Sequence, residues 1–377
     1  MDLQSIVKSL AHVKPNGRPY VSLYLNLETD VVSRKESERF LIERYQRLVK
    51  GDLQTIPFGH EANEIWHKIE NYLAEERSSG TRGVAIFARY EEEGKLNFLT
   101  HEFPLPFDNK LVVDSVPHIF PLVYLLDVSY HYLVLISDSE KAKIFEIRFG
   151  QIEDIELISD AESEKSFRGE WTQLHYQNWK NDKVKRFVKS KIDIVEKLMT
   201  ERDIKHLIMA GDERIVAEIK GQLPPALVEK VVDFSRMHIR SNPELVLHKT
   251  LEEFARYERA AETGVVDSLQ YQVARDGLGV VGSEKTIEAL NMGKVDTLLV
   301  SLDFDAPGGW RCEACGHLTM AILRQSCLAC KSDDVFHVDL KDDIVRRAAQ
   351  IGATIETVTD NSWLDKHEGI GALLRFR

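Results

Sequence analysis

The chain has 377 residues, of which 43% are hydrophobic and 29% charged, and its formal net charge at pH 7 is −12. This composition is typical of a globular protein with several domains, and no stretch approaches the roughly 18–20 apolar residues of a membrane-spanning helix. The acidic balance excludes a protein covered in positive charge, so a nucleic-acid-binding surface has to be local. The start of the chain lacks the basic and apolar regions of a signal peptide, which predicts a cytoplasmic protein without membrane contact.

Residues 1–127 are predicted to form an N-terminal α/β domain. Tyr20–Leu27 alternates apolar and polar residues as a half-buried strand does, and Gly83–Ala88 is a short apolar strand. Between them, Ser33–Val49 and Ala62–Leu73 carry apolar residues at helical spacing. The predicted order is therefore a strand, two helices and further strands.

Residues 128–240 are predicted to form a middle domain. Its pattern indicates three strands, a long helix, a fourth strand and a helix that starts near Asp212. The first five elements are Tyr132–Ser137, Lys141–Arg148, Gln151–Ile158, Lys183–Arg202 and His206–Ala210. This order is typical of an RNase H-like fold, and the polar stretch Ser159–Asp182 precedes the long helix.

Residues 241–377 are predicted to form the third domain, which begins at the breaker pair Asn242-Pro243. The pattern indicates a long charged helix, a helix followed by a buried strand, a second helix, a short strand and the chain end G-I-G-A-L-L-R-F. These segments are Glu244–Glu262, Thr286–Val300, Asp342–Ile351, Thr354–Thr357 and Gly369–Phe376.

All four cysteines of the chain lie in the zinc knuckle, residues 310–332, as two C-x-x-C pairs: Cys312, Cys315, Cys327 and Cys330. Each C-x-x-C turn brings two sulfurs close enough to share one ion, and four thiolates suit a closed tetrahedral zinc site with a structural role. The alternatives are disulfides or four unrelated buried thiols. His317 follows the first pair and is predicted to lie at the surface, because four thiolates already complete the shell.

The third domain closely resembles that of the class-I peptide-release factors of archaea and eukaryotes and of their relative Pelota. The resemblance lies in the helix–strand unit, the cysteine-containing insertion and the terminal G-I-G-x-L-L-R-F. It implies an α/β (α+β) protein of three domains, with an RNase H-like middle domain and an α/β/α C-terminal domain that holds an inserted zinc ribbon.

Two motifs of that family are absent here. The loop of the first domain, Gly51–His60, reads G-D-L-Q-T-I-P-F-G-H instead of containing N-I-K-S. In the tip loop of the middle domain, residues 163–182, a single Gly169 is followed by Glu170 and Trp171 instead of by Gly-Gln. Glycine lets the backbone approach an ester closely, whereas an acid and an indole do not. We therefore predict that hydrolysis is lost and that no residue is catalytic, as in the divergent bacterial branch of Balon-like hibernation and rescue factors.

The tip loop and the start of the long helix are the candidate RNA-binding surface. Basic side chains bind phosphate and aromatic side chains stack on bases. The candidates are Arg168, Gly169, Glu170, Trp171, Gln173, His175, Tyr176, Lys183, Lys185, Arg186 and Lys189. The alternatives are loop aromatics that pack on their own domain and a basic run that is only a solvated face. Lys191 falls inside the apolar stripe of the helix, and its amine is expected to extend out to solvent.

The resemblance implies a ribosome-binding factor, acting as a monomer, that occupies the A site without cleaving peptidyl-tRNA, in hibernation or in recognition of stalled ribosomes. Delivery by an elongation-factor-type GTPase is implied in the same way. One alternative is an active rescue hydrolase that uses Gln173 or His175. Another is a zinc-stabilised RNA-processing enzyme that acts away from ribosomes.

Two further patterns are interpreted as structural. Gly277, Gly279 and Gly282 match G-x-G-x-x-G, with Asp303 about twenty residues later, but the apolar strand that a dinucleotide site requires does not precede them. We expect an ordinary turn between helices there. The carboxylates at the ends of the middle-domain strands resemble a two-metal nuclease site but are more often turn residues: Asp127, Asp138, Asp154 and Asp160.

Overall fold

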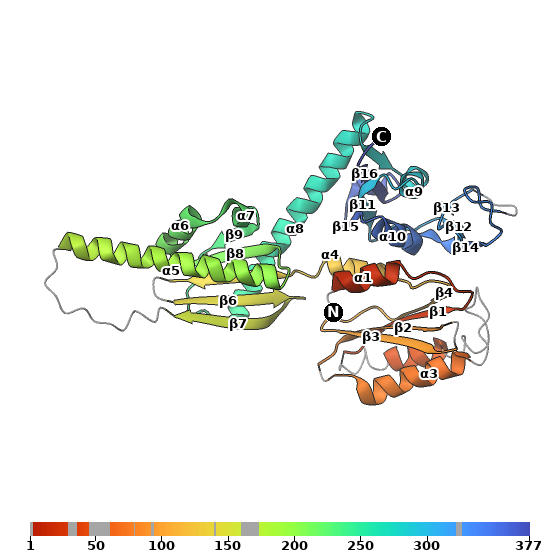
Figure 1. Ribbon diagram of the computed structural model, residues 1–377, viewed down its shortest axis with the longest axis horizontal. Helices are drawn as coiled ribbons and strands as arrows, with labels where there is room; N and C mark the ends of the chain where they lie inside the picture. The colour runs from red at the N-terminus through yellow and green to blue at the C-terminus, as the bar shows by residue number, and fades with distance from the viewer. Residues whose placement is uncertain are drawn as a thin grey trace. The chain divides into compact units, whose positions relative to one another are not determined.

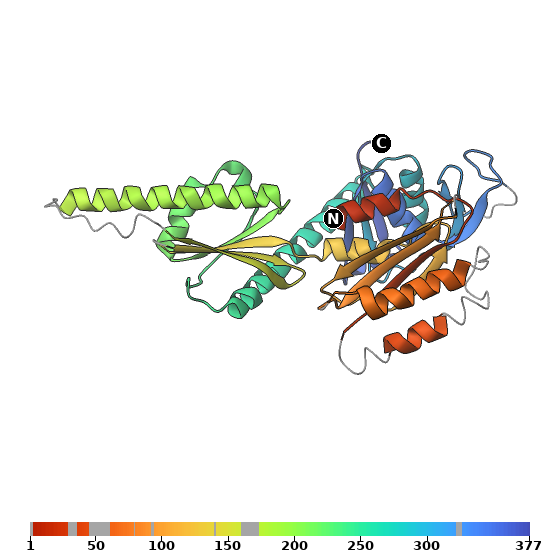
Figure 2. The ribbon, with the colours of Figure 1, turned by 60° about the horizontal axis from the view of Figure 1, so that its bottom comes forward.

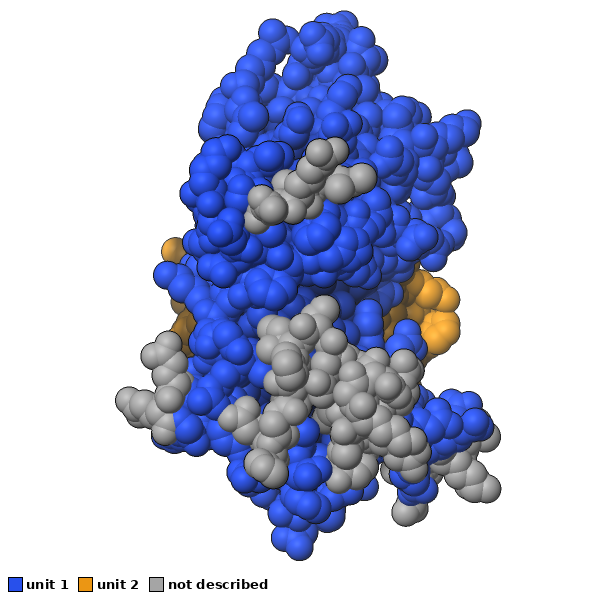
Figure 3. Space-filling model, turned by 90° about the vertical axis from the view of Figure 1, so that its right-hand side faces the viewer, with its two compact units in different colours: residues 1–127, 265–377 blue, residues 128–264 orange. Residues whose placement is uncertain are grey.

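The chain folds into two compact units in this computed structural model, as Figure 3 shows. Unit 1 contains residues 1–127 and 265–377, and unit 2 contains residues 128–264. The structure describes residues 3–28, 36–44, 61–78, 80–91, 94–138, 141–159, 173–321 and 326–377. No helix in these described ranges is both long and apolar enough to cross a bilayer.

The N-terminal part of unit 1 is built on an antiparallel four-stranded sheet of order β3-β2-β1-β4. The strands are β1 (Tyr20–Asn26), β2 (Gly83–Tyr90), β3 (Leu96–Phe103) and β4 (Lys110–Asp114). The two central strands are buried along almost their whole length, as the apolar sequence of β2 predicted.

One face of this sheet is covered by the predicted helices. Helix α3 (Glu61–Asn71) continues into the π-helical turn Tyr72–Glu76 and buries Ile65, Trp66 and Ile69 in the sheet's core. Residues 36–44 are helical and lie beside α3 (Figure 2). The remainder of the predicted helix Ser33–Val49 and the loop Gly51–His60 lie outside the described residues.

The opposite face of the sheet carries two helices that the sequence pattern did not indicate (Figure 1). They are α1 (Leu3–Ala11) and α4 (Phe120–Asp127). Both pack against α10 (Leu340–Gln350) of the C-terminal segment, so the two ends of the chain meet within unit 1.

The C-terminal part of unit 1 has a sheet of order β10-β16-β11-β15. Its strands are β10 (Gly279–Val281), β16 (Ile370–Leu374), β11 (Val295–Ser301) and β15 (Thr354–Val358). Strands β11 and β15 are parallel and the other pairs are antiparallel. Helix α9 (Ser283–Asn291) precedes β11, and the short α11 (Ser362–Asp365) precedes β16. The cysteine-containing insertion lies between β11 and α10, as predicted.

Unit 2 holds a five-stranded sheet of order β7-β6-β5-β8-β9, the RNase H-like order. Strands β5 (Tyr132–Ser137), β6 (Lys141–Arg148) and β7 (Gln151–Ser159) are antiparallel, and β8 (His206–Gly211) and β9 (Val231–Ser235) run parallel to β5. Helices α6 (Glu213–Gln222) and α7 (Pro225–Val228) connect β8 to β9. The predicted mixed α/β fold with an RNase H-like middle sheet is confirmed.

Two long helices are longer than predicted: the first begins earlier in the chain, and the second ends later. Helix α5 is Gln173–Glu201, so the expected loop up to Asp182 is wrong for its last ten residues, which contain no glycine or proline to break a helix. Helix α8 is Pro243–Ala274, and its residues up to Gly264 belong to unit 2. The domain limits predicted from the sequence remain predictions.

Candidate metal centre and RNA-binding surface

The four cysteines lie on a small three-stranded ribbon of order β13-β12-β14. Its strands are β12 (Gly308–Cys312), β13 (Leu318–Thr319) and β14 (Val335–Asp339). All four sulfur atoms lie within 4.8 Å of one another. The Sγ atoms of Cys312 and Cys330 are 3.6 Å apart, and those of Cys315 and Cys327 are 3.7 Å apart. A disulfide requires a distance of about 2.05 Å, so the sulfurs are not bonded in pairs.

This arrangement fits a zinc ion. Zn–S bonds of about 2.3 Å in a tetrahedron separate the sulfurs by about 3.8 Å, close to the two separations present here. Burial raises the pKa of the Cys327 thiol, but the N–H groups of Cys330 and Ala329 outweigh burial and bring that pKa down to about 7. Burial and the neighbouring thiols raise the pKa of Cys315 to about 12, against the effect of the His317 N–H. A bound cation would supply the charge that lets all four ionise together.

His317 is not a ligand in this geometry. Its backbone oxygen accepts a hydrogen bond from the N–H of Cys312 at 3.0 Å, which closes the first C-x-x-C turn. Its side chain is half-buried instead of lying free at the surface, and burial together with Arg347 lowers the pKa of its imidazole. The expectation of a surface histidine is therefore only partly right.

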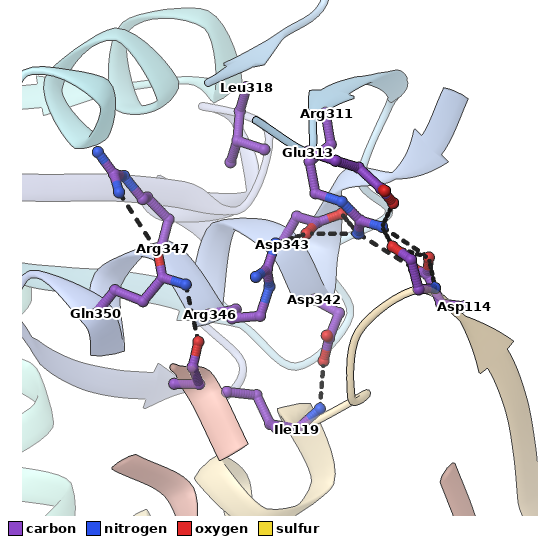
Figure 4. Close-up of polar contacts among 12 residues, drawn as sticks. Asp114, Ile119, Arg311, Glu313, Leu318, Asp342, Asp343, Arg346, Arg347 and Gln350 are labelled. Carbon is purple, nitrogen blue, oxygen red and sulfur yellow. Dashed lines mark hydrogen bonds and ion pairs between the residues drawn. The ribbon is translucent and has the colours of Figure 1, made fainter. Parts of the chain in front are cut away.

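A buried arginine, Arg311, lies next to the first cysteine and was not singled out from the sequence. Its side chain is 1% exposed, and Nη1 donates to both carboxylate oxygens of Asp343 at 2.9 and 2.8 Å. Nη2 donates to Asp114 Oδ1 at 2.7 Å and to Ser115 Oγ at 2.6 Å (Figure 4). Asp114 ends β4 of the N-terminal sheet, so one guanidinium connects the ribbon, α10 and the N-terminal segment.

Three further contacts connect the same two segments. Asp342 Oδ1 accepts hydrogen bonds from the N–H groups of Ile119 and Phe120 at 2.8 Å each, which caps the start of α4. The side-chain amide of Gln350 donates to the backbone oxygen of Ala11 at 2.8 Å, and Asp127 Oδ2 accepts from the N–H of Thr357 at 3.0 Å. The carboxylate of Asp127 therefore has a structural role.

Helix α5 carries the described part of the predicted RNA-binding surface. Lys185, Arg186 and Lys189 are all exposed. On the opposite face, Val188, Ile192, Val195, Leu198 and Met199 pack on the sheet with Leu133 and Leu135, as the helical period predicted. The basic residues therefore form an exposed face in the middle part of the helix, opposite its buried side.

The other RNA-binding candidates are less fully described. Gln173, His175, Tyr176 and Lys183 lie on α5, but their side chains are outside the described part. Arg168, Gly169, Glu170 and Trp171 lie outside the described residues altogether. Their proposed contacts with RNA remain predictions.

Lys191 does not extend to solvent, contrary to expectation. Lys191 is 1% exposed. Its Nζ donates hydrogen bonds to Ser137 Oγ at 2.5 Å and to the backbone oxygen of Asp138 at 3.0 Å. Nζ also lies 3.6 Å from the centre of the Phe187 ring. The end of β5 supplies oxygen acceptors that stabilise the buried amine, and this is why it does not reach outward.

The two patterns interpreted as structural do not form sites. Gly279 begins β10, a short strand paired with β16, so the expected plain turn between helices contains a strand, and helix α8 precedes it. Asp138 accepts a hydrogen bond from the N–H of Lys141, and Asp154 pairs with Arg202. Within the described ranges, the four cysteines are the one group of side chains close enough together to hold a metal ion, and Asp160 lies outside those ranges.

Two family models match the chain. "Bacterial archaeo-eukaryotic release factor family 10" matches residues 117–255, and "eRF1 domain 3" matches residues 259–377. The "Peptide chain release factor subunit 1" of Thermococcus onnurineus is 22% identical over 417 residues, covering 100% of this chain and 97% of the relative. The "Protein pelota homolog" of Methanocaldococcus jannaschii is 28% identical over 175 residues, covering 45% of this chain and 47% of the relative.

Two solved structures are also similar. Dom34 of S. cerevisiae has a TM-score of 0.42 and 10% identity, covering 78% of this chain and 86% of that one. The archaeal translation termination factor aRF1 has a TM-score of 0.27 and 16% identity, covering 99% of this chain and 97% of that one. The two family models match most of the middle and third domains, and the Thermococcus onnurineus relative aligns with the chain over its whole length. The chain belongs to the archaeo-eukaryotic release-factor and Pelota family of translation factors.

Proposed function

We propose that this protein binds the ribosome in the A site and occupies it without cleaving peptidyl-tRNA, as a bacterial member of the family. The observation that carries the proposal is the family match combined with an exposed basic face on α5 in a chain whose net charge is −12. An acidic protein that binds ribosomal RNA has to concentrate its positive charge, and Lys185, Arg186 and Lys189 do so.

The loss of hydrolysis is proposed from the chemistry of the tip-loop sequence. Where the family places Gly-Gly-Gln, this chain has Gly169 followed by Glu170 and Trp171. A carboxylate next to phosphates is repelled, and an indole occupies the space that a glycine leaves for the ester. The protein therefore blocks the site, in hibernation or in recognition of stalled ribosomes, and an elongation-factor-type GTPase delivers it in the cytoplasm.

Ribosome binding is tested by sedimentation with 70S particles at increasing salt. Replacing Lys185, Arg186 and Lys189 together by glutamate is expected to weaken binding about tenfold or more and to reduce the salt dependence by about one unit of slope per lost phosphate contact. The control is Lys197→Glu, which changes an exposed lysine on the same side of the helix but about three turns beyond Arg186. A wild-type protein that never migrates with ribosomes at low salt would favour an RNA-processing enzyme instead.

The absence of hydrolysis is tested separately, with a peptidyl-tRNA release assay on stalled ribosomes. We expect no release above background with the wild-type protein. Release that is abolished by Gln173→Ala or His175→Ala would establish an active rescue hydrolase and contradict the proposal. Ribosome binding would survive that outcome, because the two assays measure different steps.

A further inference from the structure

The contact between the N-terminal and C-terminal segments of unit 1 depends at one end on the cysteine ribbon. Arg311 directly precedes Cys312 on β12, and its side chain makes the hydrogen bonds to Asp114 and Ser115 across the contact. The contact of Asp342 with Ile119 and Phe120 lies at the same end, because Asp342 directly precedes Asp343, the partner of Arg311 on α10, whereas the contacts of Gln350 and Thr357 come from further along the C-terminal segment. We call this contact between residues 1–127 and residues 265–377 the seam. One end of the seam is held by Arg311 of the ribbon, and the other end is held by Gln350 and Thr357.

The backbone of Arg311 is held by strands of the ribbon, and the ribbon is attached to α9, where the side chain of Asn291 donates to the Leu318 oxygen at 2.7 Å and accepts from the Leu318 N–H at 3.0 Å. Arg311 is paired with Leu318 of β13 and with Phe336 of β14, and the described part of the ribbon sheet has no hydrogen-bonded partner in the other sheets. Strand β13 has two residues, and β12 and β14 have five each. Three short strands of this kind are not stable by themselves, so we infer that an ion held by the four sulfurs contributes to their order.

Loss of the ribbon would remove one of the two cations that compensate a buried carboxylate. The side chain of Asp343 is 3% exposed, and its carboxylate is compensated by Arg311 and by Arg346 at 2.8 Å. Asp114, which is 28% exposed, would lose its hydrogen bonds to Arg311 at the same time. A buried carboxylate that loses its cation is costly, and hydration through an opened contact relieves that cost.

We propose that metal loading of the ribbon controls the docking of residues 1–127 onto residues 265–377. With zinc bound, the ribbon presents Arg311 to Asp114 and the seam is closed at that end. Without zinc, Arg311 is released, the ribbon end of the seam opens, and the N-terminal sheet stays folded but less tightly attached. This device is independent of the proposed ribosome binding and concerns the free protein.

Hydrogen–deuterium exchange on the full-length protein tests the proposal. In the zinc-loaded protein the N–H groups of Ile119 and Phe120, which Asp342 holds, are expected to be protected. Chelation of zinc is expected to speed exchange in peptides that cover residues 114–120 by about tenfold or more, while the central strand β2 keeps its protection. Peptides of β2 that lose protection equally would indicate unfolding of the N-terminal sheet and would contradict undocking.

Arg311→Gln separates undocking from loss of the ribbon. This variant keeps all four cysteines, and its zinc content, measured by mass spectrometry, is expected to equal that of the wild type. We expect it to show the fast exchange at residues 114–120 without a chelator. The matched control is Arg236→Gln, which removes an exposed pair with Glu213 in unit 2. Unchanged exchange at residues 114–120 in zinc-loaded Arg311→Gln would overturn the proposal.

Discussion

Arg311 in unit 1 and Arg202 in unit 2 are both surrounded by carboxylates, but their surroundings differ in two ways. The side chain of Arg311 is 1% exposed and that of Arg202 is 33% exposed. Arg202 pairs with Glu146, Asp154 and Glu156, which lie on the neighbouring strands β6 and β7. Glu146 and Asp154 are already opposite each other in the register of those strands. The ion pairs of Arg202, which directly follows α5, therefore join the end of that helix to a hairpin whose two strands backbone hydrogen bonds already hold together.

Arg311 makes a contact that nothing in the local sequence provides. Asp114 lies 197 residues before it and Asp343 lies 32 residues after it. Because the group is fully desolvated, its carboxylate partners are obligatory, and the pKa of the guanidinium rises with them despite the opposing effect of burial. A buried arginine that joins distant segments is thus expected to contribute more to their association than a partly exposed one that lies beside a paired hairpin.

The strongest test of this difference is Arg311→Ala. Removing Arg311 takes away one of the two cations that compensate Asp343 and breaks the hydrogen bonds to Asp114, so we expect the free energy of unfolding of unit 1 to fall by up to about 3–5 kcal/mol. Urea denaturation followed by tryptophan fluorescence and circular dichroism measures this loss. Arg311→Lys keeps the charge but not the paired hydrogen bonds and is expected to lose less. A loss below about 1 kcal/mol for the alanine variant would place Arg311 in the same class as Arg202.

The pH dependence of stability sharpens the comparison through Asp342 and Glu146. Burial opposes ionisation of Asp342, but His118 and the N–H groups of Phe120 and Ile119 outweigh it and hold its pKa below the ordinary 3.8. A pKa that is lower in the folded state gives stability that is present above pH 3.8 and is lost as the pH falls through the folded value. In the Asp342→Asn variant, the free energy of unfolding is therefore expected to fall less steeply than in the wild type as the pH is lowered below 3.8.

The matched variant is Glu146→Gln. Burial also opposes ionisation of Glu146, and hydrogen bonds from His131 and Arg202 lower its pKa from 4.5. Its stabilising contribution is likewise lost as the pH falls below 4.5, but we expect a smaller change in that steepness because Arg202 is partly solvated. Acid-induced unfolding curves of both variants, followed by circular dichroism, give the two slopes. An equal or larger effect at Glu146 would contradict the distinction.

The smallest expected effect is that of Arg202→Ala. Partly exposed ion pairs contribute about 0–1 kcal/mol, so this variant is expected to lose less than about 1 kcal/mol in urea denaturation. Strands β6 and β7 remain paired by their backbone hydrogen bonds. Exchange protection of that hairpin is therefore expected to stay unchanged, and its loss would show that Arg202 holds the strands together.

The sequence predicted best what short-range patterns encode. The spacing of the four cysteines anticipated the sulfur cluster, and the helical period of Val188, Ile192 and Val195 identified the buried face of α5. The start of α5 at Gln173 was missed because a polar run without glycine or proline is equally compatible with a loop and with an exposed helix. Polarity reports exposure more directly than it reports secondary structure.

Contacts that depend on the tertiary fold had no local signal. The chain has 61 acidic residues, and nothing distinguishes Asp114 and Asp343 among them before the fold brings both to Arg311. The burial of Lys191 was missed for the same reason, since its acceptors belong to Ser137 and Asp138 at the end of a strand. The general tendency of lysine side chains to reach solvent describes an average environment. The oxygen atoms of Ser137 and Asp138 that bind this amine are brought to it only by the fold.

The buried amine of Lys191 also sets the rotational angle of α5 about its own axis. Apolar side chains alone tolerate a small rotation or slide of a helix on a sheet, because one methyl group replaces another. An ammonium group held by Ser137 Oγ and the oxygen of Asp138 tolerates neither, since a shift of one residue would turn it about 100° away from both acceptors. The direction in which Lys185 and Lys189 face the solvent is thereby fixed by the fold.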